Sequence, residues 1–270
     1  MRRAFSFHAN SGNNLRMIRV GTSGWVYGDW RERFYPKGVA QKRWLSYYAE
    51  RFDTVELNAT TYRLPKEDQV RVWCETVPPN FRYTVKLSRL ITHRKTLPAR
   101  VDEFIENYVS RAECFEVGKV AQILVQFPPF LERDDAHLEA FLDKLPPHHR
   151  YVVEFRHKSW LVAHVEDMLR ERRMAFCIHD YPGFRMRDVV TSEALAYVRL
   201  HGYEGLYVGS YPKRALQRWA RRIEELAGQA RDVYVYFNND TAAAAPYDAL
   251  RLRDMLTGAH PNSGKTSRNS

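Results

Sequence analysis

Short runs of β-branched and aromatic residues recur along this chain, with longer amphipathic stretches between most of them. This alternation constrains the fold more than any other feature. Each run is five or six residues long, the usual length of a strand. The runs are Ile18–Thr22, Thr54–Asn58, Arg82–Leu87, Gln122–Phe127, Tyr151–Arg156, Ala175–His179, Ala196–His201 and Val233–Asn238. Because a helix is the usual connection between parallel strands, the alternation predicts a parallel sheet.

The stretches between the runs carry apolar residues at spacings of three and four, which is typical of helices. Trp44, Leu45 and Tyr48 follow this spacing in the first of them. Helices are predicted over Gln41–Arg51, Lys66–Thr76, Val101–Phe115, Asp134–Lys144, Val162–Arg172, Lys213–Ala227 and Pro246–Leu256. The connection from Asp180 to Ala194 is expected to hold at most a short helix.

Eight such units in roughly 240 residues match the size of a TIM-type (β/α)8 barrel. We therefore expect an α/β protein with a single domain over residues 17–258. An open, doubly wound sheet fits the alternation too, but the first strand is not followed by a G-x-G-x-x-G turn. Residues 1–16 and 259–270 are predicted to be disordered extensions, and the chain is expected to start at Met1 or Met17.

Composition excludes several classes of protein. No run approaches the roughly 18 apolar residues of a membrane span, so we expect a soluble, cytoplasmic protein that makes no membrane contact. Cys74, Cys114 and Cys177 lie too far apart for a zinc ribbon and are predicted to be buried free thiols. The net charge of +10 falls to +5 without the five basic residues of the two ends. That excess fits an acidic substrate, or a basic surface that serves only solubility.

Charged and amide side chains stand at the predicted carboxyl ends of the strands, where a barrel builds its active site. Glu56 and Asn58 alternate with Val55 and Leu57, so one face of that strand is polar. The same positions elsewhere hold Lys86, Gln126, Glu154, Arg156, His157, His179, Asp180, Arg199, His201 and Asn238. Since the helix layer is apolar, this polar set is expected to point into the barrel or its mouth. Burying an ion costs several kcal/mol unless it is paired, so the set either forms internal ion pairs or meets a ligand.

Two further signals lie in the predicted loops. The segment Gly21-Thr22-Ser23-Gly24-Trp25 offers N–H groups and hydroxyls that suit an anion, or it forms an ordinary tight turn. Aromatic residues crowd the loops after the strands, namely Trp25, Tyr27, Trp30, Tyr62, Trp160 and Tyr211. Such rings either stack on sugars and nucleobases or only pack the barrel mouth.

Histidines at or after the strand ends raise the question of a metal. His93, His157, His179 and His201, with Glu56, Glu154 and Asp180, include suitable ligand types. No H-E-x-x-H motif is present and neighbouring cations oppose a metal's charge, so no metal site is expected. The P-loop, the G-x-S-x-G elbow and the C-x-x-C motif are absent as well, and no cofactor is expected.

At these positions the sequence resembles the family known as domain of unknown function 72, or YecE-like. The resemblance runs from about Ile18 to Leu256. It rests on Gly21–Trp25 with Tyr27 and Trp30, Phe34–Pro36, Phe52–Pro65, Val85-Lys86 with Thr92-His93, Gln126–Pro129, Glu154–His157 with Trp160, Tyr197–Gly202 and Tyr236–Asn239. Thr61 departs from the aromatic residue expected beside Tyr62, so this part of the site is expected to be slightly reshaped. The resemblance implies a TIM-type barrel and no particular activity.

The polar strand ends favour an enzyme, a hydrolase or an isomerase, acting on a phosphorylated or sugar-containing anion. Lys86, Arg156 and Arg199 would clamp its phosphate or carboxylate. Glu56 and Glu154 would be the acid/base pair, their pKa values separated by unequal burial, and His201 or His179 would relay protons. The other candidate substrate contacts are Ser23, Trp25, Asn58, Tyr62, Gln126, His157, Trp160 and Asn238.

Two other functions stay open at this point. A nucleic-acid-binding barrel of the phosphodiesterase type, analogous in fold to endonuclease IV enzymes, would use the positive charge and the aromatic rim. A non-catalytic ligand-binding protein would keep the same ion pairs for structure alone.

Overall fold

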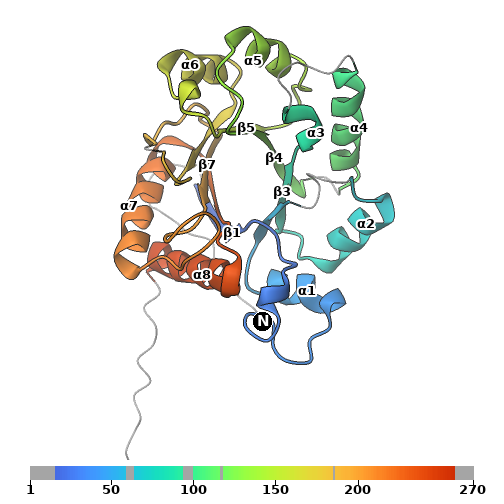
Figure 1. The fold of residues 1–270 in the computed structure, drawn as a ribbon. Helices are drawn as coiled ribbons and strands as arrows, with labels where there is room; N and C mark the ends of the chain where they lie inside the picture. Colours follow the sequence, from blue (N-terminus) through green and yellow to red (C-terminus); the bar gives the residue numbers. More distant parts are fainter. Residues whose placement is uncertain (1–15, 59–63, 94–99, 116–117, 185, 259–270) are drawn as a thin grey trace, which may run out of the picture.

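The computed structural model describes residues 16–58, 64–93, 100–115, 118–184 and 186–258. Eight parallel strands form a nearly closed barrel in the order β1-β8-β7-β6-β5-β4-β3-β2, and helices surround it (Figure 1). The strands are β1 (Met17–Thr22), β2 (Thr54–Leu57), β3 (Arg82–Lys86), β4 (Val120–Phe127), β5 (Tyr151–Phe155), β6 (Ala175–His179), β7 (Leu195–Leu200) and β8 (Asp232–Phe237). This confirms the predicted TIM-type barrel and all eight predicted strands. The predicted extensions fall almost wholly outside the described residues.

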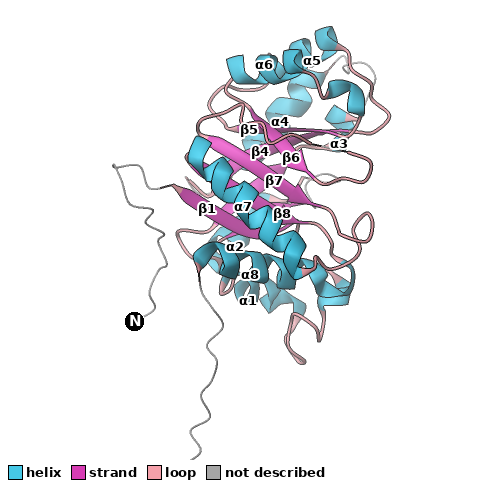
Figure 2. Ribbon diagram, turned by 90° about the vertical axis from the view of Figure 1, so that its left-hand side faces the viewer, coloured by secondary structure: helices cyan, strands magenta, loops and turns pink. Residues whose placement is uncertain are grey.

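The helices occupy the connections between strands and cover the outside of the barrel (Figure 2). They are α1 (Trp44–Ala49), α2 (Glu67–Thr76), α3 (Arg89–Thr92), α4 (Val101–Glu113), α5 (Asp135–Leu142), α6 (Ala163–Glu171), α7 (Lys213–Gln229) and α8 (Ala244–Thr257). The seven predicted helices are confirmed, and the described part of the β6–β7 connection holds none. Helix α3 was not predicted, because four residues are too few to display a helical period.

Two separate apolar clusters stabilise the barrel. The larger one lies between the strands and the helices, and it includes Val198 and Leu200 of β7. The smaller one fills the interior, with Leu124, Val152, Ala175, Cys177, Leu195, Tyr197, Tyr234 and Tyr236. Alternate residues of a strand thus face opposite layers, as the period of two requires. The polar strand ends of the inner face therefore open above a packed interior.

Hydrogen bonds close that interior below the polar strand ends. The Tyr236 hydroxyl lies 2.5 Å from Thr54 Oγ1 and 2.9 Å from Thr84 Oγ1. Gln122 Nε2 donates to Thr84 Oγ1 at 2.6 Å. Every one of these groups is buried, and a buried polar group is stable only when it is bonded. The barrel is therefore a filled core, with its open end on the side of the carboxyl ends of the strands.

The seam between β1 and β2 is the weakest part of the barrel wall. Among the described residues a single bridge, between Ser23 and Glu56, joins the two strands. Gly21 permits their close approach, because a Cβ added there would lie 2.4 Å from the Thr54 carbonyl oxygen. A residue with a side chain cannot occupy this position without moving one strand.

The cysteines agree with the sequence in part. Cys74 and Cys177 are buried thiols, as predicted. The prediction for Cys114 was wrong, because this residue is exposed. It follows the last residue of α4, and its thiol donates a hydrogen bond to the backbone carbonyl of Ser110 in the same helix. In the described part of the chain no helix combines the length and apolarity that a membrane crossing requires.

Candidate functional site

A buried guanidinium lies between two buried carboxylates at the carboxyl ends of the strands. Arg199 Nη2 donates to Glu56 Oε1 at 2.7 Å, and Arg199 Nη1 donates to Glu154 Oε2 at 2.7 Å. All three side chains have 0% exposure. They come from β7, β2 and β5, so the barrel brings together residues that are far apart in sequence. The expected convergence of these ionised groups is observed.

Each carboxylate also accepts hydrogen bonds from groups that hold it in place. Glu56 accepts from the Ser23 hydroxyl at 2.7 Å and from the Tyr197 hydroxyl at 2.6 Å. Glu154 accepts from Gln126 Nε2 at 3.0 Å and from Arg156 Nε at 2.9 Å. We refer to Ser23, Glu56, Gln126, Glu154, Arg156, Tyr197 and Arg199 as the ion-pair layer.

The two carboxylates stay ionised in this layer. Burial alone would raise the pKa of Glu56, but the charges of Arg199 and Lys86 outweigh it and lower the pKa. Burial likewise opposes ionisation of Glu154, and Arg156 and Arg199 hold its pKa well below the usual range. The expected unequal burial of the pair was wrong, because both side chains lie inside the barrel with no exposure. Their ordinary state is therefore the carboxylate.

His201 extends the layer toward β6. Its Nε2 lies 3.2 Å from Arg156 Nη2 and 3.3 Å from Arg199 Nη1. Since both partners are donors, Nε2 acts as the acceptor of a neutral ring. Burial, followed by the charge of Arg199, lowers the pKa of His201 to about 4, against the opposing effect of Asp180. The imidazole is thus kept neutral between two guanidinium groups.

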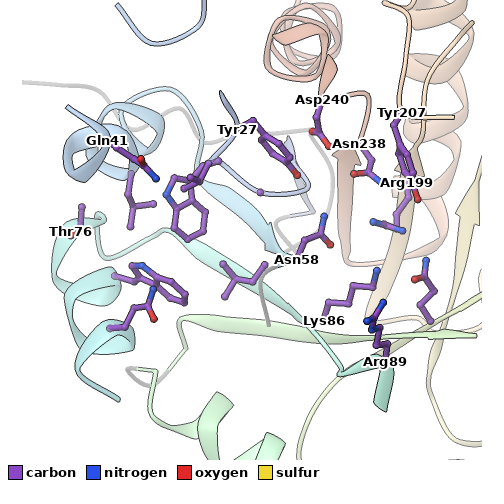
Figure 3. A pocket seen from close by; sticks show the side chains of 18 of the residues that line it. Tyr27, Gln41, Asn58, Thr76, Lys86, Arg89, Arg199, Tyr207, Asn238 and Asp240 are labelled. Carbon is purple, nitrogen blue, oxygen red and sulfur yellow. The ribbon is translucent and has the colours of Figure 1, made fainter. Parts of the chain in front are cut away.

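A cavity of about 1070 Å³ opens above the ion-pair layer. Its polar floor and one wall include Asn58, Lys86, Arg199, Tyr207, Asn238 and Asp240 (Figure 3). The cavity is also lined by the apolar residues Trp25, Leu45, Leu57, Val72 and Trp73, together with the polar residues Gln41, Lys42, Gln69 and Thr76. Trp25 and Trp73 meet edge to face, with ring centroids 5.3 Å apart. The cavity therefore suits a ligand with an anionic part and a flat or apolar part.

Lys86 enters this cavity from the end of β3 and is 9% exposed. Its backbone carbonyl accepts a hydrogen bond from the hydroxyl of Tyr108 in α4. Burial, then the positive charges of Arg199 and Arg156, lower the pKa of Lys86 to about 7, although Glu154 and Glu56 act in the other direction. The side chain therefore exists as ammonium and as free amine at neutral pH.

Asp240 lies on another wall of the same cavity, three residues after the end of β8. Its Oδ1 is buried and accepts no hydrogen bond from the described residues, although the carboxyl group is in hydrogen-bond contact with the Tyr27 side chain. Burial raises the pKa of Asp240 to about 8, so its carboxyl group carries a proton at neutral pH. The backbone carbonyl oxygen of Asp240 accepts a hydrogen bond from Trp30 Nε1 at 3.0 Å, and this bond anchors the backbone.

The backbone after Asp240 is strained. Ala242 and Ala243 have φ values of 56° and 60°, a left-handed conformation that alanine rarely adopts. The Ala242 N–H donates to Asp29 Oδ2 at 3.2 Å, and this bond helps to hold the turn. Strain of this kind costs on the order of 1 kcal/mol per residue and clusters at functional sites.

The structure assembles most of the predicted site residues. Trp25, Asn58, Lys86, Gln126, Arg156, Arg199 and Asn238 line the cavity. Four other predicted residues do not line the cavity but lie beneath it, in hydrogen-bond contact with Arg199 or with each other. They are Ser23, Glu56, Glu154 and His201. Tyr62 lies outside the described residues.

Two predicted contacts lie elsewhere. The His157 ring accepts from Ser159 N at 3.3 Å and begins the short helix η4 (Lys158–Trp160). Trp160 is fully buried against Phe127 and Phe155, and its indole N–H donates to the carbonyl of Leu131. Neither residue lines the cavity. Both come after the strand has ended, where the alternation of faces no longer applies.

Sequence reasoning missed several residues of the cavity. They include Gln41, Lys42, Leu45, Gln69, Val72, Trp73, Thr76, Arg89, Tyr207 and Asp240. Asp240 could have been found, since it follows the polar end of β8 directly. Tyr207 has a φ of 67°, and its hydroxyl accepts a hydrogen bond from Arg156 Nη1 at 3.1 Å. No local sequence pattern predicts either feature.

The histidines considered as metal ligands are engaged otherwise. His179 Nε2 lies 3.0 Å from the Phe155 carbonyl oxygen, and its Nδ1 accepts from Tyr181 N. Across the described ranges, the one group of three ligand-type side chains with close ligand atoms is Glu113, His148 and His149. It joins the last residue of α4 to the segment just before β5, at the opposite end of the barrel from the cavity.

Comparisons with known proteins agree with the resemblance found in the sequence. The profile of a family described as protein of unknown function DUF72 matches residues 19–269. The UPF0759 protein YunF of Bacillus subtilis is 27% identical over 274 residues, which cover 89% of this chain and 95% of that protein. The UPF0759 protein YecE of Escherichia coli K12 is 30% identical over 157 residues, which cover 58% of this chain and 54% of that protein.

Solved structures show the same fold. A DUF72 family protein of Thermotoga maritima superposes with a TM-score of 0.79 at 29% identity, covering 89% of this chain and 99% of that one. A DUF72 family protein of Enterococcus faecalis gives a TM-score of 0.78 at 21% identity, covering 91% of this chain and 97% of that one.

Proposed function

The chain belongs to the DUF72 family, and from the geometry of its cavity we propose that it is an enzyme, a hydrolase or an isomerase, acting on a phosphorylated or sugar-containing anion. Free thiols at Cys74, Cys114 and Cys177 are typical of a reducing compartment, so we place this activity in the cytoplasm. The family description carries no activity, so the proposal rests on the site.

One observation carries the proposal, namely the excess of cations at the floor of the cavity. Arg199 is shared by Glu56 and Glu154, and Arg156 pairs with Glu154 as well. Lys86 adds a third cationic group against these two carboxylates, and its lowered pKa reflects the neighbouring guanidinium charges as well as burial. A phosphate or carboxylate bound at this floor would be attracted by these cationic groups.

The cavity also offers groups for the rest of a sugar. The amides of Asn58 and Asn238 face the same space as Lys86 (Figure 3). Amides donate to and accept from hydroxyl groups, which gives them the versatility that a polyol requires. The indole of Trp25, which lines the cavity, provides a flat apolar surface.

Acid/base chemistry needs one group that gives a proton and one that accepts it near neutral pH. The carboxyl of Asp240, with a pKa of about 8, is suited to give a proton. Glu56 and Glu154 have lowered pKa values. In this proposal they stay ionised and hold Arg199 in position, or they accept a proton as bases. The neutral ring of His201, with a pKa of about 4, serves in this proposal as a hydrogen-bond acceptor that positions Arg156 and Arg199, not as the proton relay that the sequence suggested.

Thermal unfolding in the presence of inorganic phosphate, glucose 6-phosphate and glucose tests the proposal. We expect inorganic phosphate and glucose 6-phosphate to raise the Tm of the protein and glucose to leave it unchanged. Ligand at about 100 times its Kd would stabilise the native state by about 2.7 kcal/mol. Arg156→Gln should reduce the shift by half or more, whereas Arg71→Gln, at an exposed ion pair with Asp68, should retain it. An equal response of both variants, or no response of the wild type, would overturn the anion site.

A further inference from the structure

Lys86 is placed to act as a nucleophile as well as a cation. We propose that its Nζ forms an imine with a carbonyl carbon of the substrate, so that the cavity takes aldehydes, ketones or open-chain sugars that carry a phosphate or carboxylate. The requirement for an anionic group rests on the function proposed above; the covalent step is a separate claim about this residue.

The position of Lys86 is fixed at its base. It ends β3, where it is in register with Leu124 of β4, and the Tyr108 hydroxyl holds its carbonyl oxygen. The side chain extends into the cavity toward the space shared with Asn58 and Arg199 (Figure 3). A carbonyl carbon bound in that space would meet an amine that approaches from one direction only, in a site that excludes much of the solvent.

The charges around Lys86 favour the reactive form of the amine. Arg199 from β7 and Arg156 after β5 oppose its protonation, while Glu56 from β2 and Glu154 from β5 support it. His93, after α3, faces it as a neutral ring because its pKa is lowered to about 4 by burial and by the charge of Lys86. With a pKa of about 7, the neutral amine is a well-populated form at pH 7. In an unperturbed lysine, less than about one amine in a thousand is neutral at that pH.

The step balances with the groups present. The lone pair of Nζ adds to the carbonyl carbon, and the carbonyl oxygen takes up a proton from nitrogen to give a carbinolamine. A water molecule in the cavity carries a proton from the protonated carboxyl of Asp240, on another wall, to the hydroxyl as that leaves as water. The products are an iminium ion, one water and the Asp240 carboxylate, with no oxidant or reductant required. Nearby Glu56 and Glu154 stabilise the positive charge of the iminium ion.

An iminium ion acidifies the neighbouring carbon, which is what an isomerase or a carbon–carbon lyase requires. The substrate's anionic group would be held by Arg156, whose Nη1 faces Tyr207 at the cavity wall. This division assigns the anion to Arg156 and the carbonyl carbon to Lys86. It predicts that an aldehyde without an anionic group reacts poorly.

Reductive trapping tests the proposal without a known substrate. Wild-type protein is incubated with glyceraldehyde 3-phosphate and sodium cyanoborohydride, and the adduct is counted by intact mass and located by peptide mapping. We expect one adduct per chain, on Lys86, formed at least about tenfold faster than with glyceraldehyde. The yield at Lys86 should rise through pH 7. Labelling spread over exposed lysines such as Lys66, with Lys86 unmodified, would overturn it.

Two variants complete the experiment. Lys86→Arg keeps a cation and should lose the adduct, whereas Lys66→Arg, at an exposed position, should retain it. Mapping of the wild type needs no variant, so a misfolded Lys86→Arg leaves the test intact. If inorganic phosphate raises Tm but no adduct forms on Lys86, the imine is refuted and the anion site stands. If the adduct forms on Lys86 equally fast with and without the phosphate group, the imine stands and the anion requirement falls.

Discussion

Arg199 and Glu56 are 143 residues apart in sequence, and their side chains meet at 2.7 Å inside the barrel. They belong to β7 and β2, which are not neighbours in the sheet. The pair therefore links strands across the interior, close to the seam where β1 and β2 share a single bridge at Glu56 itself. The candidate site and the closure of the barrel depend on the same carboxylate.

Removing Arg199 should be strongly destabilising. Arg199→Met leaves Glu56 and Glu154 buried with fewer partners, and breaking a buried pair in this way costs about 3–5 kcal/mol. Urea denaturation at pH 7 measures the effect. Arg71→Met at the exposed pair with Asp68 is the control, for which we expect less than about 1 kcal/mol. Equal losses in the two variants would mean that the ion-pair layer contributes nothing to folding.

Glu154 should make the protein sensitive to acid. Its pKa is depressed in the folded state, so its contribution to stability is present above the pKa of the unfolded chain and is lost as pH falls through the folded value. The free energy of unfolding should therefore decline below about pH 4.5 in the wild type. Glu154→Gln should flatten this decline, which denaturant melts from pH 2 to pH 7 would reveal. An unchanged acid limb would show that the carboxylate titrates normally.

Asp240 should act in the opposite direction. Its folded pKa of about 8 lies above the unfolded value of 3.8, so the native state binds more protons and stability falls as pH rises between those values. Asp240→Asn should thus stabilise the protein at pH 9, by on the order of 1 kcal/mol or more, and have little effect at pH 4. Urea melts at the two pH values would measure the difference. A variant that is equally stable relative to wild type at both would refute the raised pKa.

Gly21 should tolerate no side chain. In Gly21→Ala the new Cβ would lie 2.4 Å from the Thr54 carbonyl oxygen, so one strand must move at the seam. We expect a loss of about 1–3 kcal/mol, as for overpacked cores. Gly28→Ala is the matched control, because nothing lies within 4 Å of its added Cβ. Thermal or urea unfolding compares them, and similar stabilities would mean that the seam is more compliant than its geometry indicates.

Adjacent residues after β5 should differ in binding. Arg156 lines the cavity and pairs with Glu154, whereas His157 caps η4 outside it. Arg156→Gln should weaken phosphate binding at least tenfold, about 1.4 kcal/mol, while His157→Ala should leave it unchanged. Isothermal titration with inorganic phosphate provides the measurement. Loss of phosphate binding in His157→Ala, with binding retained in Arg156→Gln, would show that the anion binds near His157 and not in the cavity.

Much of the fold could be predicted from the chain because it depends on local periodicity. Each strand is a short run of β-branched and aromatic residues, and each long helix carries its own apolar stripe. The same period of two predicted that Glu56 and Arg199 face the interior, and both do. These features follow from backbone geometry within a few residues, so no distant contact is needed to predict them.

Local periodicity was sufficient to predict the number of strands, the barrel they form and the inner face that holds the charged residues. The meeting of charges depends instead on the closed barrel, which shares Arg199 between Glu56 and Glu154 and places Lys86 near two guanidinium groups as well as those two carboxylates. The tertiary structure also decided that Asp240 belongs to the cavity and that His157 and Trp160 do not. Pairing and pKa depend on distances between strands and on the exclusion of water, and neither exists before the barrel closes.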